Sequence, residues 1–277
     1  MTWRAHLKIE YELSEQKRTV ARHQHQGPLR VIRSMYPEGP QVCHHVIVHP
    51  PGGLVQGDCL EIDVDVAPGA HGLVSTPGAT RFYRSTGEWA EQHIKIRMQA
   101  GARFEWLPLE TIAYNACRAR NTLNFTLDEG AELMAWDVAS LGLHHAGQPF
   151  ERGCLHQRME WPGHWLEQAH IDATDVRLLR SPAGLAGHSA LATLVLACGT
   201  PIMRQRREHL LVQTRAVVEA SPLALQCGIT CPNDHMLVAR ALADQVEPVM
   251  ALWQTLWATL RREAWDMPQA PPRIWRV

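Results

Sequence analysis

The sequence predicts a mainly β protein: a superhelical or layered β body of stacked strands, with a small C-terminal α+β lobe that contains two helices. Three observations predict this class. Apolar and polar residues alternate with a period of two, a glycine-anchored unit recurs about every 30 residues, and helical spacing appears after residue 183. The body should span 1–182, and the lobe, 183–277, should pack on it as a single structural unit. A sandwich of ordinary hairpins is the alternative for the body.

The recurring unit is a strand, a turn that contains glycine, and a second strand. Three copies are clear, with first strands at 60–66, 93–98 and 122–127, turns at Gly69, Gly101 and Gly130, and second strands at 72–76, 103–107 and 132–136. A degenerate fourth copy covers 155–167 around Gly163. Alternating strands joined by tight glycine turns are half-buried, so the copies should stack into β layers that bury one another.

The C-terminal lobe combines strand and helix patterns. Strands are expected at 190–197 and 236–242, and helices at 202–218 and 246–262. Pro248 is tolerated only in a first turn, so the last helix should begin near it. Helical spacing places six apolar residues on one face of that helix: Val249, Leu252, Trp253, Leu256, Trp257 and Leu260. We expect the lobe to close one end of the β body.

Composition excludes several classes of function. The 277 residues carry 27 basic and 28 acidic side chains without a long run of one sign, which argues against nucleic acid and anionic membranes as partners. The N-terminal segment lacks a signal-peptide core, and apolar runs of membrane-spanning length are absent, so a cytoplasmic protein is expected. The seven scattered cysteines are typical of buried thiols in a reducing compartment, and no CxxC zinc pair occurs.

Common catalytic signatures are also missing. The chain contains no GxxxxGK[ST], no GxGxxG between a strand and a helix, no GxSxG and no HExxH. Nucleotide binding, hydride transfer, α/β-hydrolase chemistry and zincin chemistry therefore lack their local requirements.

The segment 49–85 is the most informative part of the chain. His49 is held extended by Pro50 and leads into two glycine-rich turns, Pro51-Gly52-Gly53 and Gln56-Gly57. The second turn delivers Asp58 to the start of an alternating strand. The local backbone is therefore organised around one carboxylate.

Four carboxylates lie where the repeat would stack them: Asp58, Glu110, Asp137 and Glu167. A buried carboxylate is costly unless it is paired, hydrated or bound to a cation. Acids that face inward would therefore indicate a water-filled or metal-accessible passage. The alternative for each is a structural role, in which the carboxylate caps a turn or accepts hydrogen bonds from backbone amides.

Other candidate ligands and contact residues have ordinary explanations. The pairs His44-His45 and His144-His145 and the motif His23-x-His25 are best explained as solvated or singly hydrogen-bonded imidazoles, because adjacent side chains on a strand point to opposite faces. Cys227, Cys231 and His235 share helical spacing, but Pro232 disfavours a helix there. Trp253 and Trp257 should pack on the lobe's sheet, or dock a partner if the sheet leaves them uncovered.

Five sequence blocks resemble one known family in order from Tyr36 to Trp275. They are HPPGGLVQGD, PGAHGLVSTPGATRFYRS, FEWLPLETI, LMAWDVASLG with FERG, and the C-terminal PRIW. Together these blocks resemble the urease accessory protein UreD family, also called UreH. Gln56 stands where the family usually has glycine, and Arg81 where lysine is common.

The resemblance implies a non-enzymatic maturation factor with a superhelical β body and two helices. Such a protein binds apo-urease (UreABC) and recruits the GTPase UreG through UreF, and nickel passes through it, weakly and transiently bound, in a water-filled tunnel. The resemblance carries the nickel path to Asp58, Thr80, Asp137 and Glu167, with Glu110 as a further acid beside it. Partner contacts are expected at Trp253, Trp257, Arg273 and Trp275, the last two from the PRIW block.

Weak oxygen ligands suit such a path. Thiolates or several imidazoles would hold nickel tightly, whereas carboxylates, hydroxyls and water release it. With association near 10^6 per molar per second, a roughly micromolar site empties about once per second, while a picomolar site holds the ion for days.

Two other classes of function stay open. One is a β-solenoid polysaccharide lyase or hydrolase with a catalytic carboxylate pair, which needs separations of about 5–5.5 Å or about 6.5–9.5 Å in an open cleft. The other is a purely structural adaptor in which all four acids cap turns.

Overall fold

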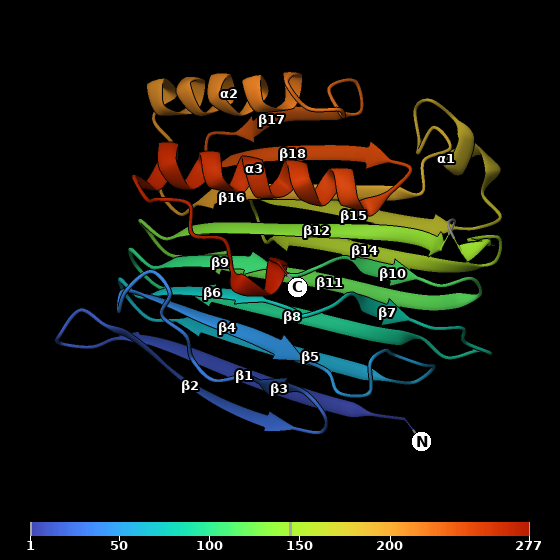
Figure 1. Ribbon diagram of the computed structural model, residues 1–277, viewed down its shortest axis with the longest axis horizontal. Coiled ribbons are helices and arrows are strands. Elements are labelled where there is room, and N and C mark those ends of the chain that lie inside the picture. The colour runs from blue at the N-terminus through green and yellow to red at the C-terminus, as the bar shows by residue number, and fades with distance from the viewer. Residues whose placement is uncertain (1, 144–145, 277) are drawn as a thin grey trace.

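A computed structural model describes residues 2–143 and 146–276 as three layers: a seven-stranded sheet, an eleven-stranded sheet, and two helices on the outer face of the larger sheet (Figure 1). In spatial order the smaller sheet contains β15 (Trp165–Asp172), β14 (Gly153–Trp161), β11 (Cys117–Leu127), β8 (Ala90–Met98), β5 (Cys59–Val66), β1 (Arg4–Leu13) and β2 (Thr19–Gln26). The larger sheet contains β17 (Cys227–Asn233), β18 (Met236–Ala243), β16 (Ala190–Cys198), β12 (Glu132–Leu143), β9 (Arg103–Leu107), β6 (His71–Ser75), β4 (Val42–Val48) and β3 (Arg30–Val31), with β7 (Thr80–Phe82), β10 (Thr111–Ala113) and β13 (Gln148–Pro149) attached.

The glycine-anchored repeat builds both sheets, which confirms the predicted layered β body. Each first strand (β5, β8, β11) lies in the smaller sheet, and each second strand (β6, β9, β12) crosses to the larger one; strands of adjacent copies pair in parallel in both sheets. The turn glycines have φ of +68°, +66° and +73°, a conformation that glycine adopts at little cost. The alanine after each glycine, at positions 70, 102 and 131, is fully buried at the corner.

The fourth copy departs from this pattern. β15 turns back antiparallel to β14 within the same sheet instead of crossing to the other sheet. The connection has three residues, 162–164, where the corners have four, and His164 replaces the buried alanine. His164 N donates to Trp161 O at 2.9 Å, which closes a hairpin. The shorter turn therefore ends the stack of crossing units.

The C-terminal segment extends the larger sheet. β16 pairs antiparallel with β12 and covers the edge that the last repeat would otherwise expose; β18 and β17 follow. Helices α2 (Arg204–Glu219) and α3 (Val246–Trp265) lie over this sheet, and two short helices, α1 (Val176–Arg180) and η2 (Arg273–Arg276), were not predicted. The two predicted long helices and the strands at 190–197 and 236–242 are confirmed. No helix in the described part of the chain is long and apolar enough to cross a membrane.

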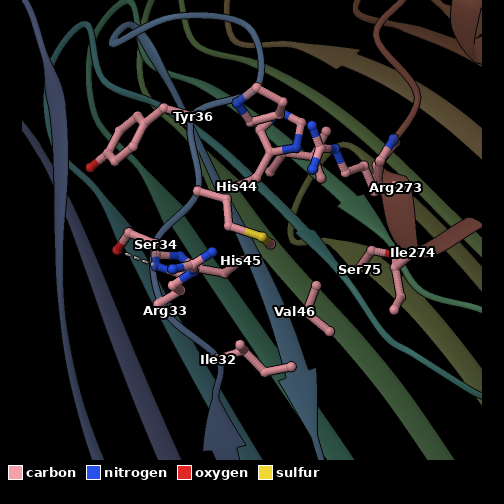
Figure 2. A pocket seen from close by; sticks show the side chains of 14 residues that line it. Ile32, Arg33, Ser34, Tyr36, His44, His45, Val46, Ser75, Arg273 and Ile274 are labelled. Carbon is pink, nitrogen blue, oxygen red and sulfur yellow. Dashed lines mark hydrogen bonds between the residues drawn. The ribbon is translucent and has the colours of Figure 1, made fainter.

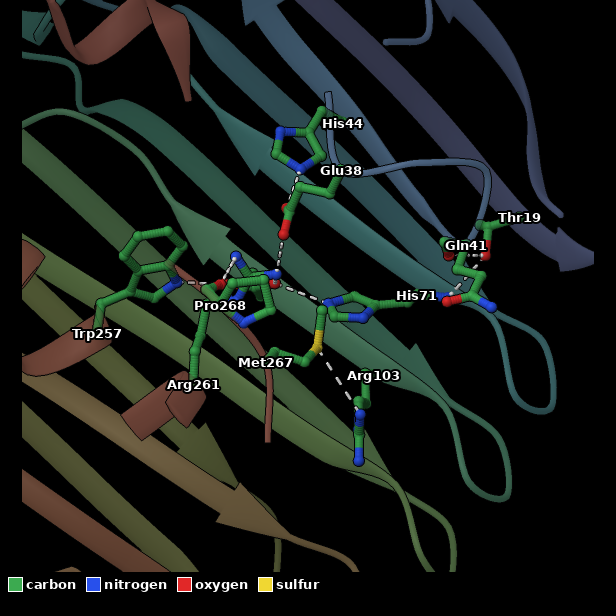
Figure 3. A network of polar contacts seen from close by, with 11 residues as sticks. Thr19, Glu38, Gln41, His44, His71, Arg103, Trp257, Arg261, Met267 and Pro268 are labelled. Carbon is green, nitrogen blue, oxygen red and sulfur yellow. Dashed lines mark hydrogen bonds and ion pairs between the residues drawn. The ribbon is translucent and has the colours of Figure 1, made fainter. Parts of the chain in front are cut away.

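A buried ionic cluster fastens α3 to the larger sheet (Figure 3). The Arg261 guanidinium has no exposed surface and lies 2.7 Å from a Glu38 oxygen and 3.5 Å from a Glu105 oxygen. His71 and the Trp257 indole also hydrogen-bond Glu105. Burial would raise the pKa of Glu105, but the charge of Arg261 and the bond with His71 outweigh it and hold this pKa below its usual value.

Candidate functional site

A row of polar side chains crosses the inner face of the smaller sheet. Gln92, Asn121 and Gln157 occupy matching register positions on β8, β11 and β14. Each lies two residues from core residues on both sides along its strand, so its side chain shares their face and points into the space between the sheets. We call these three residues the amide row.

The amide row bonds to an acid from the opposite sheet. Asp137, on β12, accepts a hydrogen bond of 2.9 Å from Gln157 Nε2, and Asn121 Nδ2 lies 3.4 Å from the same carboxylate. Gln92 Nε2 in turn donates to Asn121 Oδ1 at 3.2 Å. A continuous polar connection therefore runs from β8 to the far layer at Asp137.

Burial raises the pKa of Asp137 to about 6. The hydrogen bond from Gln157 opposes this shift, and the negative charge of Glu167 adds to it. Such an acid is ionised at neutral pH but costly to keep charged. A cation beside it would lower that cost.

Glu167 lies at the end of the row, on β15. It accepts hydrogen bonds of 2.6 Å from Thr193 Oγ1 and 2.6 Å from Arg240 Nε. Glu167, Asp137 and Thr193 line a cavity of about 50 Å³. This space suits one or two water molecules or an ion, since a water occupies about 30 Å³ in the liquid. It is far below the roughly 300 Å³ of small ligand sites, which argues against the carbohydrate-enzyme alternative.

Thr80 lines a second cavity, of about 250 Å³, at the other end of the row. The glycine-rich segments 52–53 and 76–81 form part of its wall, and Gln92 lines it as well. Gln92 thus connects this cavity to Asn121 and, through Asn121, to Asp137. The structure therefore places Thr80 at the cavity on one end of the amide row and Asp137 and Glu167 at the cavity on the other end.

Asp58 does not join this row. Its side chain is 1% exposed, with Oδ1 accepting from Trp3 N at 2.7 Å and Oδ2 from Val55 N at 2.9 Å. The structure therefore supports the turn-capping alternative for this acid. Gln56 does not disturb the turn, because the positive φ of +80° falls on Gly57. Its side chain instead accepts a hydrogen bond of 2.9 Å from Thr86 N.

Glu110 also lies apart from the row. It lines a different cavity, of about 180 Å³, together with Ser140, Ser189, Asp244 and Glu247. Its backbone carbonyl accepts a hydrogen bond of 2.9 Å from Thr80 N, so its place near the row is structural.

His49 is a further candidate ligand that was not predicted from the sequence. Its Nε2 is buried, has no hydrogen-bond partner among the described residues and belongs to a ring that lines the 250 Å³ cavity beside Thr80. Burial lowers the pKa of this imidazole, while the charge of Asp58 raises it. The position of His49 at the start of the glycine-rich segment 49–85 was a usable signal. The sequence did not, however, identify a second ligand or a hydrogen-bond partner for this side chain.

The other histidines and cysteines that the structure describes form no chelating cluster. His44 bonds to Glu38 at 2.7 Å, and His45 bonds to Tyr11 at 2.7 Å and Ser34 at 2.8 Å. His144 and His145 lie outside the described residues. Within 2–143 and 146–276, no three His, Cys, Asp or Glu side chains are arranged to hold a metal, and this includes Cys227, Cys231 and His235.

The predicted partner residues fall into two groups. Trp253 is fully buried and Trp257 is 2% exposed beneath α3, so the docking-stripe alternative is wrong for both, because the sheet covers them. Trp275 is partly buried, and its indole donates to Ser75 Oγ at 3.0 Å. Arg273 is exposed and lines an apolar groove of about 540 Å³ between segments 32–37 and 272–274 (Figure 2).

Fold and site together define a solenoid-like β protein that encloses a polar row between its sheets. The profile of the UreD urease accessory protein family matches residues 4–276. The chain is 52% identical to Urease accessory protein UreD of Variovorax paradoxus over 275 residues, 99% of each chain. It is 52% identical to the protein of that name from Albidiferax ferrireducens over 277 residues, and 50% identical to that from Leptothrix cholodnii over 278, covering 100% of each chain. The chain belongs to the UreD urease accessory protein family.

Proposed function

We propose that this chain is a scaffold for urease maturation that conducts nickel to the enzyme. In this proposal it binds apo-urease (UreABC) and UreF in the cytoplasm, and UreF recruits the GTPase UreG, which hydrolyses GTP. The chain itself is not a catalyst. Membership of the accessory family supports the scaffold role, and the polar row supports the passage of an ion.

The connection from Gln92 through Asn121 to Asp137 is the observation that carries the conduit. Its donors are amide and carboxylate oxygens, which bind nickel weakly enough to release it. The described residues hold no cluster of three strong ligands along the way. A row of this kind favours transfer over storage.

Asp137 is the best nickel ligand in the row. A carboxylate must lose its proton to bind a metal. With a pKa of about 6, Asp137 meets this condition at neutral pH, and its burial next to Glu167 gives a passing cation a favourable electrostatic environment. Glu167 is the next acceptor but is already paired with Arg240.

For the scaffold role we propose that a partner protein contacts the groove at Arg273. Arg273 is the exposed member of the four predicted partner residues, and the groove walls include Ile32, Val46 and Ile274. An apolar groove with a cationic rim suits a partner segment with apolar and acidic side chains.

Coexpression with urease and its other accessory proteins tests the proposal. Asp137→Asn should lower the nickel content and activity of urease about tenfold while the accessory complex still assembles. Glu160→Gln is the matched control, because Glu160 lies on β14, the strand that also carries Gln157, and pairs with Arg158 on the face of the smaller sheet opposite to Gln157. Full nickel loading with Asp137→Asn would refute the conduit but leave the scaffold role. In that case the structural adaptor becomes the better account.

A further inference from the structure

We propose that His49 is a metal ligand, and that its Nε2 provides a nitrogen donor for a borderline divalent cation in the cavity beside Thr80. The inference rests on the proposed function for the identity of its cargo, Ni²⁺. It adds a residue and a type of donor that the carboxylate path does not contain.

The first argument is the missing hydrogen bond. Within residues 2–143 and 146–276, His49 Nε2 is buried without a hydrogen-bond partner, whereas about nine in ten buried polar groups have one. The ring lines a cavity of about 250 Å³, which has room for an ion with several water molecules. The ring that carries this nitrogen therefore borders a space with room for a hydrated cation.

The second argument is that the backbone fixes the ring at the cavity wall. Gly52 N donates to His49 O at 2.8 Å and closes the turn, and Gly52 has φ of +82°. A Cβ at Gly53 would lie 2.2 Å from the Tyr83 ring, so this position requires glycine for close packing. Rigid placement lowers the cost of ordering a ligand when metal binds.

The third argument is charge. Burial lowers the pKa of His49, so the imidazole is neutral at pH 7 and metal need not displace a proton from it. The negative charge of Asp58 acts on the imidazole and raises its pKa, although the Asp58 oxygens accept hydrogen bonds from backbone amides. Thr80 and Gln92, whose side chains contain oxygen donors, line the same cavity, and Arg81 is the cationic side chain among its lining residues.

His156 shows that an unpaired nitrogen alone does not make a site. Its Nε2 is also buried with no hydrogen-bond partner in the part of the chain that the structure describes, and burial lowers the pKa of this imidazole too. Its ring, however, packs against Trp89, with centroids 4.6 Å apart, and against His170, 4.0 Å apart. His156 alternates with the core residue Leu155 on β14, so it points away from the space between the sheets. It is therefore a matched control.

The test uses full-length protein labelled with ¹⁵N-histidine. Zn²⁺ serves as a diamagnetic probe, because direct coordination shifts the Nε2 resonance of the bound imidazole. We expect the His49 resonance to shift, and Ni²⁺ to compete for the same site, while the His156 resonance stays in place. Because this measurement needs no substitution, a folding defect cannot obscure it. A His49 resonance that is unchanged at saturating Zn²⁺ and Ni²⁺ would overturn the proposal.

Variants then separate this inference from the proposed function. His49→Gln should weaken Ni²⁺ binding in the cavity about tenfold and lower urease nickel loading, while His156→Gln should change neither. If His49→Gln binds and delivers nickel like wild type but Asp137→Asn does not, the role of His49 is refuted and the conduit stands. If neither His49→Gln nor Asp137→Asn changes nickel delivery, both the role of His49 and the conduit are refuted.

Discussion

Gln157 Nε2 donates a 2.9 Å hydrogen bond to Asp137 Oδ2, and this bond joins the two sheets of the β body. Gln157 lies on β14 in the smaller sheet and Asp137 on β12 in the larger one. Most of the space between these sheets is filled by apolar side chains. A polar contact in that position, linked through Asn121 to a cavity at Thr80, requires an explanation beyond packing.

The stability of Asp137→Asn tests the electrostatic part of this explanation. The folded-state pKa of Asp137 is raised from 3.8 to about 6, so the folded protein binds this proton more tightly than the unfolded chain does. The contribution of Asp137 to the free energy of unfolding is therefore most favourable below about pH 4. It decreases as the pH rises and is fully unfavourable above about pH 6. Asp137→Asn should raise the free energy of unfolding by about 1–3 kcal/mol at pH 7 and by little at pH 4. Urea unfolding at both pH values measures this; a variant less stable than wild type at pH 7 would show that the ionised carboxylate stabilises the fold.

Nickel binding should depend on pH through the same group. Because Asp137 titrates at about pH 6, its contribution to nickel affinity should fall about tenfold per pH unit below that value. Isothermal titration calorimetry between pH 5 and 7.5 gives the profile. Asp137→Asn should flatten it, and an equally steep profile in the variant would assign the titration to another group.

Arg261→Met should destabilise the protein strongly. The substitution leaves the buried carboxylates of Glu38 and Glu105 without their cation, and the removal of one partner from a buried ion pair costs about 3–5 kcal/mol. Arg262→Met is the control, because Arg262 is exposed and pairs with the neighbouring Glu263, so a change within about 0.5 kcal/mol is expected. Equal losses in the two variants, measured by chemical denaturation, would contradict the role of the buried cluster.

Gly153 and Gly101 should respond differently to substitution by alanine. Both have positive φ, +97° and +66°, which costs alanine about 1 kcal/mol. A Cβ at Gly153 would also lie 2.3 Å from Cys117 O on the paired strand, whereas a Cβ at Gly101 meets no atom within 4 Å. Gly153→Ala should therefore lose at least about 2 kcal/mol more. Similar melting temperatures for the two variants would mean that β14 can move away from β11 at little cost.

The sequence predicted the elements that depend on local patterns. The crossing units at Gly69, Gly101 and Gly130 were correct because period-two alternation and a positive-φ glycine are local signals. The reversal of β15 was missed because one residue fewer in a turn decides between a corner and a hairpin. The parallel pairing of β1 with β5 joins segments about 55 residues apart, and no local sequence pattern predicts it.

The candidate site could be predicted only in part for the same reason. Asp137 and Glu167 were singled out by their place in the repeat, and the structure brings them to one cavity. The capping of Asp58 depends on the amide of Trp3, which only the tertiary fold brings near. The amide row was missed, because Gln92, Asn121 and Gln157 look like surface residues until the register of three strands is known.

Asn121→Leu is the most direct test of the conduit. It interrupts the polar row with an apolar side chain of similar size and removes no acid and no charge. Asn124→Leu is the matched control, because it lies three residues along the same strand and so points to the opposite face. With both variants assembled normally with their partners, the nickel content of urease should fall several-fold for Asn121→Leu and stay at the wild-type value for Asn124→Leu. Wild-type nickel content with Asn121→Leu would contradict the proposal that nickel passes along this row.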